Sequence, residues 1–119
     1  MSLFRRIECI AVFAWVAASV ACESPPANQP NTSPGFVAAM REVCDVDRLA
    51  QLDPAGNSIA VEGAREDWMN EHVKDPDAIE LLTLMRVEGP KRRAEMLRQA
   101  LEGSANRNCA LADYYEANP

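Results

Sequence analysis

The residue types that could carry chemistry gather in one acidic stretch, residues 62–72, which also holds the only histidine of the chain. Asp67 and Glu71 are four residues apart and therefore share a face of a helix, where they could hold a hard cation or act as an acid and base pair. A solvated helix face gives the same pattern, and no second segment offers the matching carboxylate and histidine set of a di-metal bundle. Asp67, Glu71 and His72 are therefore candidates for a polar site, and we predict no catalytic residue, metal or cofactor.

Two further groups could contact a partner. Lys91, Arg92 and Arg93 form the one basic run, which could meet an anionic surface or pair with neighbouring acidic residues. The acidic neighbours are Glu88, Glu95 and Glu102. Tyr114 and Tyr115 are adjacent, so only one can point inward from a helix, and the other is a candidate for a partner surface.

The first 22 residues have the pattern of a bacterial export signal. Arg5 and Arg6 precede an apolar run, residues 9–21, that ends in small side chains. This run of about 13 residues is shorter than the roughly 20 that a membrane-spanning helix needs, so we expect it to be cleaved.

The residues at the expected cleavage point, Ser19-Val20-Ala21-Cys22, resemble the lipobox of bacterial lipoproteins, with Ser19 in the position that is usually Leu. This resemblance covers residues 1–22 and implies that Cys22 is acylated and becomes the new N-terminus. The chain would then be a membrane-anchored lipoprotein of the cell envelope, facing the periplasm or the cell surface. Ser19 and Ala21 also satisfy the small-x-small rule of ordinary secretion, which would cut the same bond without adding lipid. An uncleaved N-terminus is the third possibility.

Two of the four cysteines, Cys44 and Cys109, lie beyond the signal and its cleavage point. An even pair in an exported chain predicts one disulfide. A reactive thiol pair or a zinc site would need closely spaced partners such as Cys-x-x-Cys, and the sequence has none.

The chain divides into three parts. Residues 1–21 are the expected signal peptide. Residues 22–35 are the lipidated cysteine and a linker that is expected to be disordered, because it contains four prolines and hardly an apolar side chain. Residues 36–119 remain for one helical domain.

Helical periodicity recurs throughout this domain, and no segment alternates polar and apolar residues as a strand would. We therefore predict an all-α bundle of about five short helices. Proline and glycine breaks place the helix starts near Phe36, Ser58, Pro76, Pro90 and Cys109. Gly103 is expected to end the fourth helix in the left-handed conformation.

The same periodicity predicts which side chains are buried. We expect Trp68 in the core and Arg65 on the polar face of the second helix. The third helix is apolar over most of its circumference, so we expect it to be the buried centre of the bundle. On the fourth helix, Arg93 and Arg98 are expected to lie on the outer face with the rest of the basic run.

The net charge of -6 argues against nucleic acid as a partner, because phosphates need a basic surface. Membrane attachment would then depend on the lipid at Cys22 or on an uncut apolar run. We expect a non-enzymatic binding or scaffolding module whose partners are the membrane and an envelope protein. The alternatives are a small hydrolase or metal-dependent enzyme that uses the carboxylates of Asp67 and Glu71 with His72, and a secreted effector or inhibitor.

Overall fold

The computed structural model describes residues 30–119, and all of the regular secondary structure in this range is helical. The six helices are α2 (Pro34–Cys44), α3 (Val46–Leu49), α4 (Ser58–His72), α5 (Pro76–Met85), α6 (Pro90–Ala100) and α7 (Ala110–Ala117). No strand occurs in these residues, so the all-α prediction is confirmed. The expected signal peptide and Cys22 lie outside the described residues.

Prolines and side-chain caps begin the helices where the sequence predicts. A proline occupies the first turn of α2, α5 and α6, where its missing N–H costs no hydrogen bond. Asn57 accepts a hydrogen bond from the N–H of Ala60, and Asp75 accepts one from the N–H of Ala78, both at 3.0 Å. Such caps satisfy donors that the first helical turn leaves unpaired.

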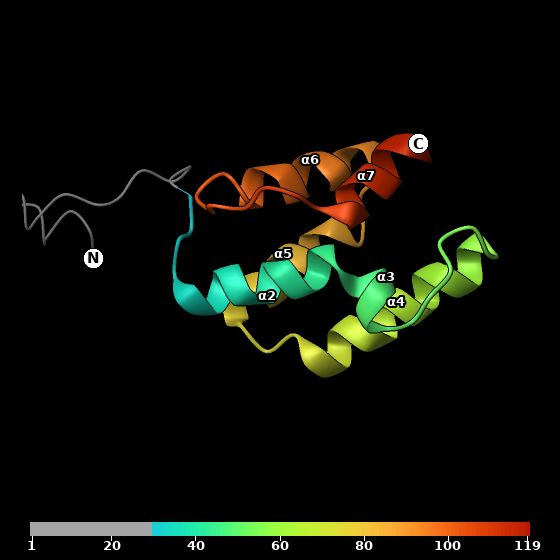
Figure 1. Cartoon of the computed structure of the whole chain (residues 1–119), viewed down its shortest axis with the longest axis horizontal. Coiled ribbons are helices and arrows are strands. Elements are labelled where there is room, and N and C mark those ends of the chain that lie inside the picture. The colour runs from blue at the N-terminus through green and yellow to red at the C-terminus, as the bar shows by residue number, and fades with distance from the viewer. Residues whose placement is uncertain (1–29) are drawn as a thin grey trace, which may run out of the picture.

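Figure 1 shows the arrangement of the helices. α2 and α5 run side by side, α6 and α7 lie together above them, and α3 leads from the end of α2 to α4. The closest backbone packing is between α6 and α7, whereas the backbone of α4 approaches mainly α3. Within residues 30–119, no helix is long and apolar enough to cross a bilayer.

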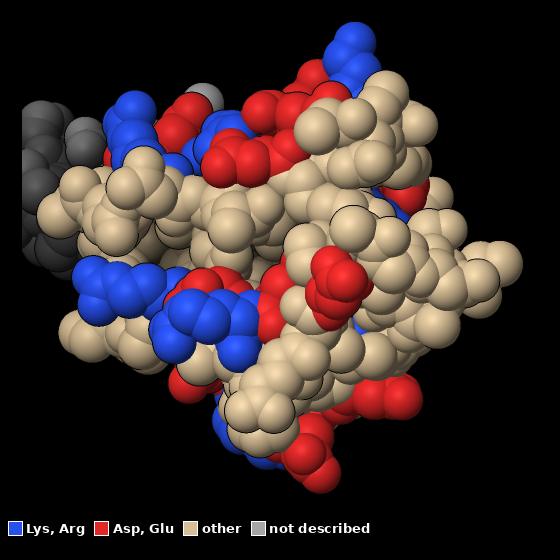
Figure 2. Space-filling model, turned by 45° about the vertical axis from the view of Figure 1, so that its right-hand side comes forward, with Lys and Arg blue, Asp and Glu red and all other residues tan. Residues whose placement is uncertain are grey.

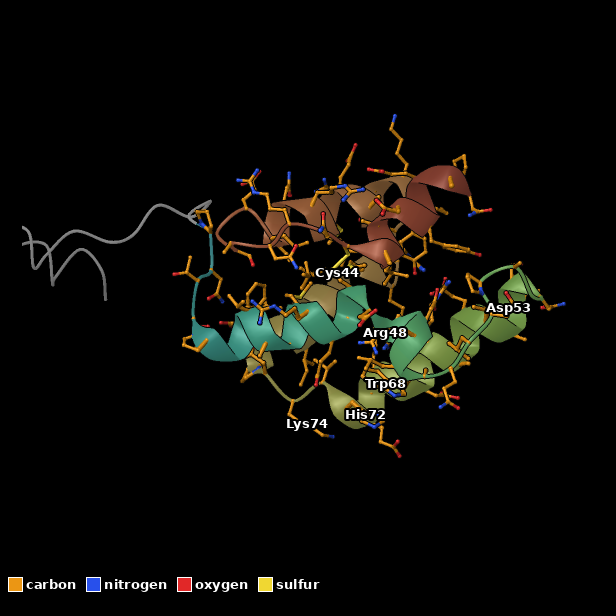
Figure 3. All side chains as sticks on the ribbon, in the orientation of Figure 1. Cys44, Arg48, Asp53, Trp68, His72 and Lys74 are labelled. Atoms are coloured by element: carbon orange, nitrogen blue, oxygen red, sulfur yellow. A yellow bond between two sulfur atoms is a disulfide. The ribbon has the colours of Figure 1, made fainter. Side chains whose placement is uncertain are left out.

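The core lies where α2, α6 and α7 meet. Met40 and Val43 of α2, Leu97 of α6 and Leu111 of α7 are fully buried there. The predicted disulfide is confirmed: Cys44 at the end of α2 joins Cys109, the residue before α7, with the two Cα atoms 4.6 Å apart. The labelled Cys44 in Figure 3 marks this bond, which connects positions 65 residues apart in the sequence.

α5 is not the buried centre of the bundle, and that prediction was wrong. It buries Ala78 and Met85, whereas Ile79 is 45% exposed and Leu84 is 54% exposed. A helix can be buried on all sides only if other helices surround it. α2 is more deeply buried, and α5 packs against α2 and α6 with one side only.

Gly103 does not take the left-handed conformation, which was the second wrong expectation, and no described glycine has a positive φ. Gly103 instead allows another segment of the chain to lie close against its backbone. A Cβ atom at Gly103 would lie 2.6 Å from Cγ2 of Thr32 and 2.9 Å from Cβ of Pro30. Only glycine therefore lets residues 30–32 pass directly over the end of α6.

The double variant Cys44→Ala/Cys109→Ala should unfold more easily than the native chain. The bond closes a loop of 65 residues, and removing it should lower the free energy of unfolding by about 4 kcal/mol through the entropy returned to the unfolded chain. Urea denaturation of the oxidised chain, the reduced chain and the double variant measures this difference. A loss below about 1 kcal/mol would contradict a stabilising role for the bond.

Candidate functional site

The predicted polar site lies on the surface of α4, near its C-terminal end. Asp67, Glu71 and His72 are all exposed. The imidazole of His72 stacks on the indole of Trp68, with centroids 4.1 Å apart, and its Nδ1 donates to the carbonyl oxygen of Trp68 at 2.8 Å. Figure 3 shows the two labelled rings at the end of α4. Trp68 itself is half-buried and packs against the core.

Asp67 and Glu71 share one face of α4, and His72 lies next to Glu71. Within residues 30–119, no hydrogen bond or ion pair joins these three side chains to another element. Nδ1 of His72 lies 3.7 Å from a carboxylate oxygen of Glu71. Across residues 30–119, no three His, Cys, Asp or Glu side chains are placed so that they could hold a metal ion. The observed role of His72 is to cover Trp68.

The densest polar group lies elsewhere, around Arg65, and sequence reasoning missed it. Arg65 was expected on the exposed face of α4, yet its side chain is 0% exposed. Its Nε and Nη2 donate to the two carboxylate oxygens of Asp47 on α3, at 2.7 and 2.8 Å. Its guanidinium also lies 4.1 Å from the centre of the Tyr114 ring on α7. A bidentate ion pair and an aromatic face are the contacts that favour a buried arginine.

A second set of polar contacts continues from Arg65 to α6. Glu62, one turn earlier on α4, lies 3.5 Å from Nη1 of Arg65 and accepts a hydrogen bond from the hydroxyl of Tyr115 at 2.8 Å. Arg93 lies 3.4 Å from the same carboxylate. We call Asp47, Glu62, Arg65, Arg93 and Tyr115 the polar cluster. It joins α3, α4, α6 and α7.

Arg93 was also expected on an outer face, and this expectation was wrong. Its side chain is largely buried, and Nε donates to the carbonyl oxygens of Met85 and Glu88 at 3.0 and 2.8 Å. Nη2 donates to the carbonyl oxygen of Arg86 at 3.0 Å. Carbonyl groups at the end of a helix have no partner within the helix, so Arg93 satisfies the end of α5.

The electrostatics of the polar cluster favour fixed protonation states. Burial disfavours the charged form of Arg65, but the hydrogen bonds to Asp47 and the nearby negative charges outweigh it and raise the pKa of Arg65. Burial, followed by the charge of Glu62 and the hydrogen bond to it, raises the pKa of Tyr115 to about 12 against the opposing effect of Arg93. Arg65 therefore stays charged and the phenol of Tyr115 stays protonated.

The polar cluster borders a cavity of about 30 Å³, lined among others by Glu62, Met69, Leu82, Arg93 and Tyr115. This volume accommodates about one water molecule and no organic ligand. Since the guanidinium donors of Arg65 and Arg93 already meet acceptors of the domain, the arrangement holds helices together.

Two other arginines of α6, Arg92 and Arg98, pair with carboxylates on the surface. Arg92 lies 3.3 Å from Glu95, one of the pairings that the sequence predicts. Arg98 bridges to α7 through Asp113 at 2.6 Å and Glu116 at 2.8 Å, and its hydrogen bonds lower the pKa of Glu116. Figure 2 shows the result as intermingled red and blue side chains along the upper edge, where α6 and α7 lie.

A groove of about 530 Å³ lies between α5 and α6, and we call it the α5–α6 groove. Its apolar lining is Phe36, Leu81, Leu84, Met96 and Ala100. Its charged lining is Asp77, Glu80, Glu102 and Arg92, and residues 30 and 31 close one end. The volume is within the range of protein binding sites.

The fold and these sites define the described residues as a small, disulfide-bonded all-α domain. No protein-family model, curated protein or solved structure matches the chain.

Replacing Arg65 by alanine should cost about 3 kcal/mol of unfolding free energy, because the carboxylates of Asp47 and Glu62 lose their buried partner. Arg48→Ala is the matched control. Arg48 pairs with Asp45, but its side chain is 73% exposed, so its removal should cost under about 0.5 kcal/mol. Chemical denaturation of both variants gives the comparison. Equal losses in the two variants would show that the buried ion pair contributes no more to the free energy of unfolding than the exposed one.

The phenol of Tyr115 should make stability depend on alkaline pH. Its pKa is about 12 in the folded protein, against about 10 in an unfolded chain, so the unfolded state releases the proton first. This contribution is fully present below pH ~10 and should fall by roughly 2 to 3 kcal/mol as the pH rises to ~12. Denaturation curves at several pH values measure the loss. Tyr115→Phe should lack it, and an identical pH profile in that variant would refute the assignment.

Proposed function

We propose that this chain is an exported, lipid-anchored protein of the cell envelope whose helical domain serves as a non-enzymatic binding module. The Cys44–Cys109 disulfide carries this proposal. Disulfides form and persist in oxidising compartments and are rare in the cytosol. Both cysteines are buried, and the bond joins the two ends of the domain, so the fold is built around an oxidised pair.

The attachment to a membrane rests on Cys22 and on the resemblance of residues 19–22 to a lipobox. The chain carries a net charge of -6, which gives no electrostatic attraction to anionic lipids. Acyl chains on Cys22 supply the binding energy instead, at about 0.8 kcal/mol for each buried methylene group. The helical domain then faces the aqueous side of the membrane.

The binding role is supported by a contrast between the arginines, which are paired within the domain, and the α5–α6 groove, which has exposed apolar side chains. Arg65, Arg93 and Arg98 direct their donors to acceptors of neighbouring helices. The α5–α6 groove, in contrast, leaves apolar side chains accessible at the surface, with Leu84 more than half exposed. Exposed apolar surface bordered by polar groups is typical of protein contact sites.

The intact mass of the protein purified from its own membranes tests this proposal. We expect the mass of residues 22–119 with added acyl groups, less the hydrogens lost in forming the Cys44–Cys109 bond. A Cys22→Ser variant should lack the acyl mass and keep the disulfide. A chain that begins at Cys22, carries no acyl groups and is found in the medium would show that the protein is secreted and not anchored. A chain from Met1 with free thiols would refute export altogether.

A further inference from the structure

We propose that the α5–α6 groove binds a basic amphipathic helix of a partner protein. This inference rests on the proposed function, since it names the chemistry of the partner that the binding module would take.

The domain leaves part of the apolar lining uncovered: Leu84 is exposed and Leu81 and Ala100 are partly exposed, whereas Phe36 and Met96 are buried in the core. Leu81 and Leu84 lie three residues apart on α5, and Met96 and Ala100 lie four apart on α6, so each pair forms a ridge along its helix. Leu84 is 54% exposed, although it sits beside the core residue Met85. An apolar helix face that covers Leu81, Leu84 and Ala100 would remove their exposed parts from water, which is favourable.

The charges on the rim determine which charge a partner segment should carry. The lining holds three carboxylates, Asp77, Glu80 and Glu102, and one guanidinium, Arg92, which already pairs with Glu95. A second guanidinium lies beside the rim, because Arg107 donates to the carbonyl oxygen of Glu102 at 3.2 Å. Glu80 and Glu102 have no ion-pair partner within 4.0 Å in the part of the chain that the structure describes. The rim therefore favours lysine and arginine, and it opposes acidic segments and anionic lipid surfaces.

The shape of the groove suits a helix. Its walls are two helices joined by a short turn, residues 86–89, and α5 with its 10 residues is about 15 Å long. A third helix can lay an apolar stripe between two such ridges, as in helix-in-groove recognition.

The charges also orient the partner along the groove. Arg92 lies in the first turn of α6, next to the connecting turn, whereas Asp77 and Glu102 lie at the other end. The contacts of the chain around residues 30–32 agree with this placement. Asn31 donates to Asp77 at 2.9 Å, while Pro30 lies close to Gly103. The basic residues of the partner should therefore lie beside Glu80 and Glu102, because Asp77 already accepts a hydrogen bond from Asn31.

A synthetic helix tests the proposal with the exported, disulfide-bonded full chain. The probe is a fluorescently labelled peptide of about 14 residues, with leucines on one helical face and lysines beside them. Anisotropy should report binding, and amide chemical shifts should change at Leu84, Met96 and Ala100 but not at Ile59, an exposed apolar residue on α4 outside the groove.

Charge-reversal variants then separate the groove from general attraction between opposite charges. Glu80→Lys should weaken binding at least about threefold, whereas Glu42→Lys, which makes the same change of charge at an exposed site on α2 outside the groove, should change it less than about twofold. Circular dichroism confirms that each variant is folded. A peptide with glutamates in place of the lysines should not bind.

Equal binding by the groove variant and the Glu42 variant, or shift changes outside the groove, would overturn the proposal. So would concentration-dependent self-association abolished by Leu84→Asp, because it would assign the groove to a second copy of this chain. None of these outcomes depends on the lipid. The mass measurement on Cys22 can therefore fail while the groove binds the peptide, and the reverse can also occur.

Discussion

The disulfide between Cys44 and Cys109 is the constraint on which the rest of the domain depends. It fixes the end of α2 beside the start of α7, so helices from opposite ends of the described chain share one core. The backbones of α2 and α7 are in contact, and Leu97 of α6 is fully buried with them. α5 then packs on the outside against α2 and α6, and its uncovered side forms one wall of the α5–α6 groove.

The polar cluster attaches α4 to the rest of the domain, just as the disulfide attaches α2 to the start of α7. α4 buries only Val61 and Arg65, and its other apolar contacts with the core come from the partly buried Trp68 and Met69. Arg65 reaches Asp47 on α3 and the Tyr114 ring on α7, while Glu62 reaches α6 and α7. Taking charges out of water is costly, and the paired geometry offsets that cost. Ion pairing thus replaces part of the missing apolar surface.

Local signals in the sequence predicted the helices and their ends, because caps and prolines act within one turn. Asn57 and Asp75 cap α4 and α5, directly before the helix starts that were predicted near Ser58 and Pro76. Contacts between helices that are distant in the sequence were predicted less well. Arg65 lies four residues after Val61 and three before Trp68, so the helical period places it on the buried stripe. Its charge argued for the opposite face, because the partner Asp47 is brought to it only by the turn between α3 and α4. The apolar composition of α5 likewise carries no information about which neighbours are present to cover it. Asp67, Glu71 and His72 stay candidates on an exposed face.

Thiol accessibility in the cells that make the protein tests the central claim most directly, namely that the domain is oxidised outside the cytoplasm. Cells are quenched with acid, fractionated, and treated with an alkylating reagent before and after reduction. The protein should be found in the envelope fraction, with Cys44 and Cys109 modified only after reduction. A full-length chain in the cytosol, with both thiols alkylated before any reductant is added, would contradict the claim.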